Sequence, residues 1–216
     1  MRMVGTIAVG IVALLASPAW AELPVVNEAR VSWQGCDYSI KVRKRAYPPD
    51  DPYPWFYYYN ISVQSEVVSL GSCSLTPRTV ELATSESEPR IAIVANAEGL
   101  VVAYSFGDYV RGLGDWYRIR IHRLDPSTLG SVRVAVLGAS FLPEDVGAGD
   151  PGAVNLQELT LHPGYLEVNG SFYGNWIMDE TETIPWPHPL LQGDRFVAIY
   201  PDFFGSTQRP PHLVTF

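Results

Sequence analysis

The feature that most restricts the fold of this chain is a two-residue alternation of apolar and polar side chains, which recurs along most of its length. Successive side chains of a β-strand point to opposite faces, so the alternation is typical of strands with one buried face. The clearest case has apolar odd positions and basic even positions: Tyr117, Arg118, Ile119, Arg120, Ile121 and His122. Because no segment of 22–216 keeps a helical period, we expect an all-β protein: a single antiparallel β-sandwich or barrel-like domain of about ten short strands, with little or no helix.

Two neighbouring segments lack the alternation because they are apolar at nearly every position. They cover 91–95 and 100–104, and a turn sequence at 96–99 separates them. A strand that is apolar on both sides needs cover on both sides. We therefore expect this pair to lie in the middle of the structure.

Two glycine-containing stretches predict turns or loops. Asn169-Gly170 lies between two short apolar segments and tolerates the positive φ angles of a type I′ turn, so the sequence predicts a hairpin there. The stretch 107–115 contains three glycines and predicts a loop.

The N-terminus has the organisation of a secretory signal peptide. Arg2 precedes an apolar run over 4–15, and Ala19-Trp20-Ala21 ends the segment with a typical cleavage pattern. The alternative, a membrane anchor, would need roughly 20 apolar residues, more than this run supplies. We predict that residues 1–21 are a signal peptide, that the protein is secreted or periplasmic, and that it is not an integral membrane protein.

The chain has two cysteines, Cys36 and Cys73, and both follow the predicted signal peptide. In an exported protein such a pair predicts a disulfide. The bond would close a loop of 38 residues, which on the chain-entropy model stabilises the fold by up to about 4 kcal/mol. The alternative use, as a catalytic thiol, requires the two sulfurs to be unbonded.

An aromatic and proline-rich stretch over 47–59 lies inside this predicted loop. Seven of its thirteen residues are aromatic and four are proline. Exposed aromatic rings stack on sugar faces or hold apolar peptide segments. We predict a ligand-binding surface made of Tyr53, Trp55, Tyr57 and Tyr59. In the alternative interpretation the rings belong to the core, and strand alternation requires Trp55, Tyr57 and Tyr59 to share one face, whichever interpretation holds.

Basic side chains recur on two predicted strands, at Arg118 and Arg120 on one and at Arg133 on the next. Guanidinium groups bind anionic groups in a bidentate manner, so these three arginines form a candidate site for an anionic group. The alternative is a solvated outer face whose charges protect a sheet from edge pairing.

Motifs for common enzymes and cofactors are absent from the sequence. It contains no Gly-x-Ser-x-Gly, His-Glu-x-x-His, Cys-x-x-Cys or phosphate-binding loop, and its four histidines are scattered. One Gly-x-Gly-x-x-Gly match at 147–152 contains Pro151 and has no strand-to-helix context, so it predicts a surface loop. We expect no metal and no cofactor, and the sequence favours a protein without catalytic activity.

The formal net charge of −8 argues against nucleic acid as a partner, and it favours a neutral or basic one. The sequence therefore predicts an exported binding or inhibitory protein that acts on a glycan or on a protein, which would be basic if charge steers the association. Two alternatives stay open: a glycan hydrolase on the same β scaffold, whose two carboxylates no local motif would reveal, and a structural component of an envelope assembly.

Overall fold

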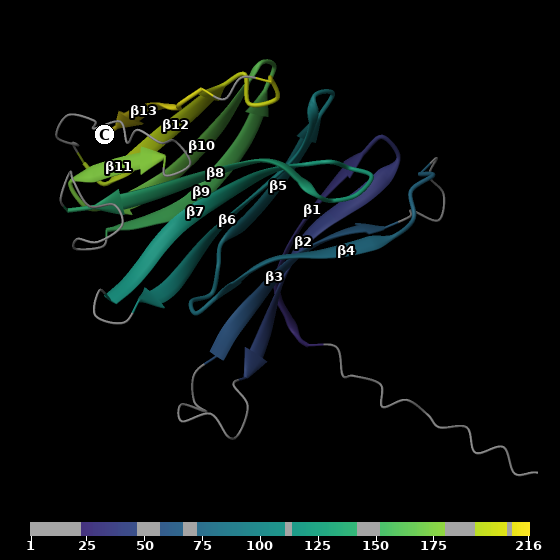
Figure 1. Cartoon of the computed structure of the whole chain (residues 1–216), viewed down its shortest axis with the longest axis horizontal. Helices are drawn as coiled ribbons and strands as arrows, with labels where there is room; N and C mark the ends of the chain where they lie inside the picture. The colour runs from purple at the N-terminus through teal and green to yellow at the C-terminus, as the bar shows by residue number, and fades with distance from the viewer. Residues whose placement is uncertain are drawn as a thin grey trace, which may run out of the picture.

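We describe the protein from a computed structural model, which describes residues 23–46, 57–66, 73–110, 114–141, 152–179, 193–206 and 209–216. The described residues contain thirteen β-strands and no helix, and they form two sheets (Figure 1). The all-β prediction is therefore confirmed, with more strands than expected. The predicted signal peptide lies outside the described residues.

The first sheet contains four antiparallel strands in chain order. They are β1 (Val25–Trp33), β2 (Cys36–Ala46), β3 (Tyr57–Glu66) and β4 (Arg78–Ser85). The second sheet contains the other nine: β5 (Ile91–Asn96), β6 (Gly99–Val110), β7 (Gly114–Leu124), β8 (Ser131–Ser140), β9 (Ala153–His162), β10 (Tyr165–Tyr173), β11 (Trp176–Asp179), β12 (Arg195–Pro201) and β13 (His212–Thr215).

The nine-stranded sheet consists of two antiparallel parts. One part has the order β5-β6-β7-β8-β11, and the other has the order β9-β10-β12-β13. A parallel pairing of β7 with β9, at Tyr117 and Ala153, joins them. Because this junction is so short, the second part folds over the first, and the molecule has three layers with β5, β6, β7, β8 and β11 in the middle (Figure 1).

Strand β6, in the middle layer, is buried on both faces over residues 100–106. Even-numbered residues of β6, such as Val102 and Tyr104, pack in a core shared with the four-stranded sheet. Odd-numbered residues, such as Val101 and Ala103, pack in a second core shared with β9, β10 and β12. All four side chains are fully buried.

The prediction of a position in the middle of the structure is confirmed for 100–104. Residues 91–95 form an edge strand of the middle layer, in which Ile93 is buried and the other side chains are partly buried against the two cores.

The hairpin predicted at Asn169-Gly170 is wrong, because both residues lie within the continuous strand β10. They mark a register shift in its pairing with β9. A Cβ atom at Gly170 would lie 2.4 Å from the Asn155 carbonyl oxygen and 2.6 Å from the Phe196 ring. The glycine therefore serves close packing of a neighbouring strand and ring.

The loop predicted over 107–115 is also wrong for most of its length. Strand β6 continues to Val110 and β7 begins at Gly114. A Cβ atom at Gly107 would lie 2.6 Å from Ser87 Oγ and 2.8 Å from the Tyr117 ring. This glycine is again required by packing, so glycine content was a poor guide to loops in this chain.

The predicted disulfide is confirmed. Cys36 at the start of β2 is bonded to Cys73, and their Cα atoms are 4.8 Å apart. The bond attaches the segment before β4 to the edge of the first core, in which Cys36 is buried.

The described part of the chain contains no helix with the length and apolar character needed to cross a membrane.

Candidate functional site

Only some of the aromatic residues predicted to bind a ligand lie within the described part of the chain. Tyr53, Trp55 and the side chain of Tyr57 lie outside the described part of the chain. Tyr59 is half-buried, and alternation along β3 places it on the same face as the fully buried Ile61. This face is the core face of the four-stranded sheet. Ligand binding by these four residues stays a prediction.

The three arginines predicted to hold an anionic group do not come together. Arg118 and Arg120 are paired across strands with Phe106 and Tyr104, so they lie on the face of the middle layer that points toward the four-stranded sheet. Arg133 is paired with Arg123, on the opposite face. A single anionic group therefore does not reach all three.

Arg133 instead forms hydrogen bonds with the turn that follows β12. Its Nη1 donates to the carbonyl oxygens of Asp202 (3.1 Å) and Phe203 (3.0 Å), and its guanidinium carbon lies 4.6 Å from the centre of the Phe203 ring. Arg123 acts alongside it, donating to the Phe204 carbonyl oxygen at 2.6 Å. These contacts assign both arginines to holding the chain near residues 202–204.

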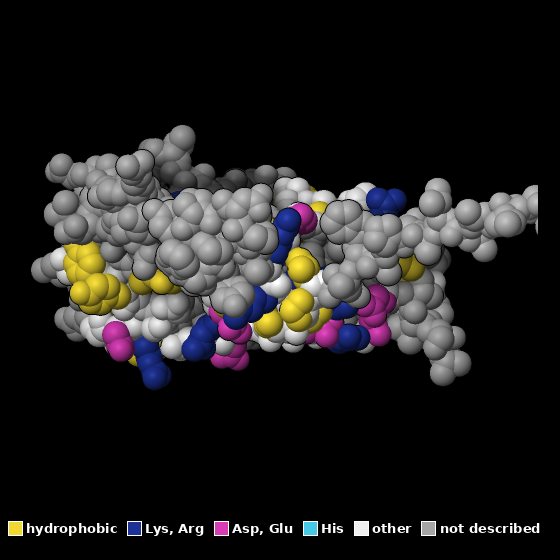
Figure 2. Space-filling model, turned by 90° about the horizontal axis from the view of Figure 1, so that it is seen from below, with side chains coloured by type: hydrophobic (Ala, Val, Ile, Leu, Met, Phe, Trp, Pro, Cys, Tyr) yellow, Lys and Arg dark blue, Asp and Glu magenta, His cyan; other side chains and the backbone are white. Residues whose placement is uncertain are grey.

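Basic residues on the outer face of the four-stranded sheet are balanced by acids. Lys41 Nζ lies 3.2 Å from Glu66 Oε1 and 3.4 Å from Glu28 Oε1, and the Lys41 side chain is 12% exposed. In the view of Figure 2, Lys and Arg side chains lie among Asp and Glu side chains rather than in a separate patch. The two carboxylates therefore balance the charge of Lys41 on this face.

A hydrogen-bonded trio connects β6, β7 and β8, and in it Tyr104 and His122 are buried while Ser131 is exposed. Tyr104 Oη lies 3.0 Å from His122 Nε2, and His122 Nδ1 lies 2.7 Å from Ser131 Oγ. Burial first, and then the Arg120 guanidinium, lower the pKa of His122 to about 4. Burial raises the pKa of Tyr104. His122 is therefore neutral at physiological pH.

The trio is a poor match for a nucleophilic serine and its base. A general base works best when its pKa lies near the operating pH, whereas burial and the Arg120 guanidinium lower the pKa of His122 to about 4. His122 is therefore a weak base for activating Ser131.

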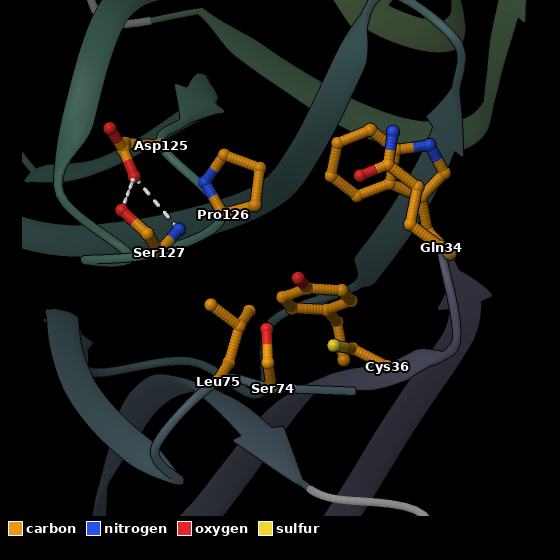
Figure 3. A pocket seen from close by; sticks show the side chains of 9 residues that line it. Gln34, Cys36, Ser74, Leu75, Asp125, Pro126 and Ser127 are labelled. Atoms are coloured by element: carbon orange, nitrogen blue, oxygen red, sulfur yellow. Dashed lines mark hydrogen bonds between the residues drawn. The ribbon is translucent and has the colours of Figure 1, made fainter. Parts of the chain in front are cut away.

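The strongest candidate site is a pocket of about 400 Å³ at one end of the first core (Figure 3). Three chain segments form it: the β1–β2 turn, the residues after Cys73, and the β7–β8 turn. It is lined by Trp33, Gln34, Cys36, Tyr38, Ser74, Leu75, Asp125, Pro126 and Ser127. Figure 3 shows Asp125 and Ser127 at one end and Gln34 at the other, with Leu75 and Ser74 opposite Pro126.

Local interactions fix each of the three segments. Gln34 and Gly35 have φ angles of 49° and 77° in the tight turn between β1 and β2. The disulfide attaches residue 73 to residue 36. Asp125 Oδ1 accepts hydrogen bonds from Ser127 N (2.8 Å), Ser127 Oγ (2.6 Å) and Thr128 N (3.0 Å). The pocket therefore exists before any ligand binds.

The pocket combines aromatic rings with hydrogen-bonding groups. The ring centroids of Trp33 and Tyr38 are 6.3 Å apart, and the ring planes are inclined by 51°. Burial, together with the negative charge of Asp125, raises the pKa of the Tyr38 hydroxyl. Hydroxyls of Ser74 and Ser127 and the Gln34 amide add donors and acceptors. Such a surface can hold a ring with apolar faces and a polar edge.

Sequence reasoning did not identify this pocket. Gly35 and Pro126 are residue types that favour turns, but nothing in the sequence near either of them shows that the two turns meet in space. Nowhere in the described ranges do three or more His, Cys, Asp or Glu side chains gather as metal ligands would. Comparisons with protein-family models, curated proteins and solved structures gave no match.

Proposed function

We propose that this protein is an exported binding protein, without catalytic activity of its own, that holds a glycan in the pocket between Trp33 and Asp125. The observation that supports this proposal is the preformed pocket in which two aromatic rings adjoin amide, hydroxyl and carboxylate groups. Sugar rings have apolar C–H faces that pack on aromatic rings, and hydroxyl edges that need donors and acceptors.

Rigidity of the walls favours binding over a passive surface depression. The turn at Gln34, the disulfide and the Asp125 hydrogen bonds each fix one wall without help from a ligand. A preformed site loses little conformational entropy when it is filled, so more of the interaction energy contributes to affinity.

Export is supported by two independent features. The N-terminal segment has the pattern of a signal peptide. The Cys36–Cys73 disulfide persists in oxidising compartments such as the periplasm or the extracellular space. Both features favour a protein that meets envelope or extracellular glycans.

Hydrolysis of the glycan is less well supported by this pocket. Glycoside hydrolysis uses two carboxyl groups on opposite sides of the scissile bond. Among the described residues that line the pocket, Asp125 is the one carboxylate. Its Oδ1 already accepts three hydrogen bonds from its own turn, which suits a positioning group better than a proton donor.

The test is titration calorimetry of the purified protein with a panel of soluble oligosaccharides. We expect saturable binding that Trp33→Ala weakens at least about tenfold, because the ring contact is lost. Gln34→Gly keeps the positive φ of the turn and removes the amide, so it should weaken binding without unfolding the protein. Tyr173→Ala is the matched control, because Tyr173 is 69% exposed and lies on β10, in a different layer.

Three results would contradict the proposal. Absence of saturable binding across the panel would exclude a glycan site. Release of new reducing ends during incubation would identify a hydrolase instead. Saturable binding of a basic protein that Trp33→Ala leaves unchanged would place the function on another surface.

A further inference from the structure

The charge of the pocket limits which sugars it accepts. Of the described residues that line it, Asp125 carries a formal charge, and the others are neutral. Hydrogen bonds from the Ser127 hydroxyl and from the backbone N–H groups of Thr128 and Ser127 lower the pKa of Asp125. The carboxylate therefore stays ionised in neutral and mildly acidic solution, and the pocket presents a negative charge.

The aromatic residues of the pocket also favour a positively charged group. The faces of aromatic rings carry partial negative charge and attract cations. Trp33 and Tyr38 both line the pocket, and because Tyr38 is only 2% exposed, the Trp33 ring supplies most of the accessible aromatic surface. The raised pKa of Tyr38 keeps its hydroxyl protonated. The electrostatic environment therefore favours a positively charged group and disfavours an acidic one, for which the described lining residues offer no cation.

The positions of the polar groups suit a ring with a charged substituent at one end. Asp125 and Ser127 lie at one end of the pocket, and Gln34 lies at the other (Figure 3). A ring lying between them would direct one substituent toward the carboxylate and its hydroxyls toward the Gln34 amide and Ser74. Trp33 and Leu75 would contact the apolar parts of the ring.

We propose that the pocket selects amino sugars, with the protonated amino group placed toward Asp125, and rejects acidic sugars. This inference rests on the proposed glycan binding and adds the chemical class of the ligand. The excess of acidic over basic side chains in the chain, with a formal charge of −8, supports the same selection at longer range.

The test compares three β-1,4-linked trisaccharides with the same ring geometry: one of glucosamine, one of glucose and one of glucuronate. At about pH 6 the amino groups are largely protonated. We expect affinity to fall in that order, by roughly fivefold at each step, which is the size of one screened charge interaction near a protein surface. About 1 M salt should reduce the differences, because it screens exposed charges.

Asp125→Asn isolates the charge. Asparagine retains a carbonyl oxygen that accepts the hydrogen bonds from Ser127 and Thr128, so the turn is kept. The variant should lose the preference for glucosamine over glucuronate, measured as the ratio of the two affinities, and its affinity for the glucose trisaccharide is measured alongside as the reference. Glu98→Gln, at an exposed carboxylate in the β5–β6 turn, removes the same charge outside the pocket lining and should keep the preference.

The outcomes separate the two proposals. If the glucose trisaccharide binds but glucuronate binds as tightly as glucosamine, or Asp125→Asn leaves the order unchanged, the inference about charge is overturned and glycan binding stands. If none of the three trisaccharides binds, the inference is overturned, and glycan binding is then decided by the wider panel. The expected order together with its loss in Asp125→Asn would establish the inference.

Discussion

Lowering the pH should destabilise the fold through His122. Burial first, and then the Arg120 guanidinium, lower its pKa from 6.5 to about 4. In the unfolded chain the imidazole recovers its ordinary pKa and binds a proton more readily than the folded protein does. The contribution of His122 to stability is therefore fully present above about pH 6.5 and is lost as pH falls toward about 4.

The magnitude follows from the size of the shift. Each pKa unit corresponds to about 1.4 kcal/mol, so the full effect is about 3 kcal/mol. By about pH 5 the loss should reach about 2 kcal/mol. This loss is a substantial fraction of the typical stability of a folded protein, which is about 5–15 kcal/mol.

The measurement is the free energy of urea unfolding at about pH 7.5, 6.5, 5.5 and 5, with the disulfide intact. His122→Gln does not titrate and should remove most of the pH dependence in this range. His162→Gln is the control, since His162 stacks on Tyr165, with ring centroids 4.4 Å apart, and is about one-third exposed. It should leave the dependence on pH in place.

The reasoning fails if the protein loses less than about 0.5 kcal/mol between these limits, or if His122→Gln keeps the full dependence. NMR titration of the His122 ring in the folded protein gives an independent answer. A midpoint near the ordinary histidine value would show that the ring is not buried beside Tyr104 and Arg120 as described. This readout does not depend on the stability of any variant.

Three further predictions concern stability. Replacing Cys36 and Cys73 together by serine should lower the free energy of unfolding by up to about 4 kcal/mol, measured in urea, and a loss below about 1 kcal/mol would contradict the loop-closure argument. Gly170→Ala should lower it by about 2–3 kcal/mol, because a Cβ atom would overlap the Phe196 ring, and an unchanged thermal midpoint would show that the strands separate freely. Arg133→Met should lower the free energy of unfolding by about 2 kcal/mol, because the hydrogen bonds to the carbonyl oxygens of Asp202 and Phe203 are lost. Arg133→Lys should be destabilised as well, because lysine lacks the planar guanidinium group. Wild-type stability of the lysine variant would refute the role of the guanidinium geometry.

The candidate site was only partly accessible to sequence reasoning. The turn residues at Gln34-Gly35 and at Asp125-Pro126 are recognisable, because local chemistry sets their backbone conformation. The sequence does not show that these two turns lie close together, because their proximity depends on how the four-stranded sheet packs on the middle layer. The same limit explains Arg133, which local alternation places on a strand but which contacts a turn about 70 residues later in the chain.

Glycine shows the clearest failure of local reasoning. The sequence predicts a loop at Gly107 and a turn at Gly170, but both lie within strands, where a neighbouring side chain or carbonyl oxygen occupies the space of a Cβ atom. A glycine in a sequence indicates either freedom of the backbone or close packing against it. Only contacts between distant segments distinguish these two causes.

By itself, the sequence determined the all-β class, the buried central position of the strand at 100–104, and the pairing of Cys36 with Cys73. These properties follow from strand periodicity, from apolar content and from the presence of just two cysteines. The first two are local patterns in the sequence, and the third is a count of residues. The tertiary structure decided which faces meet: it separated Arg133 from Arg118 and Arg120, and it brought Trp33 and Asp125 to one pocket. The physical reason is that layer packing is set by burial of apolar area summed over whole sheets, and no short segment carries that information.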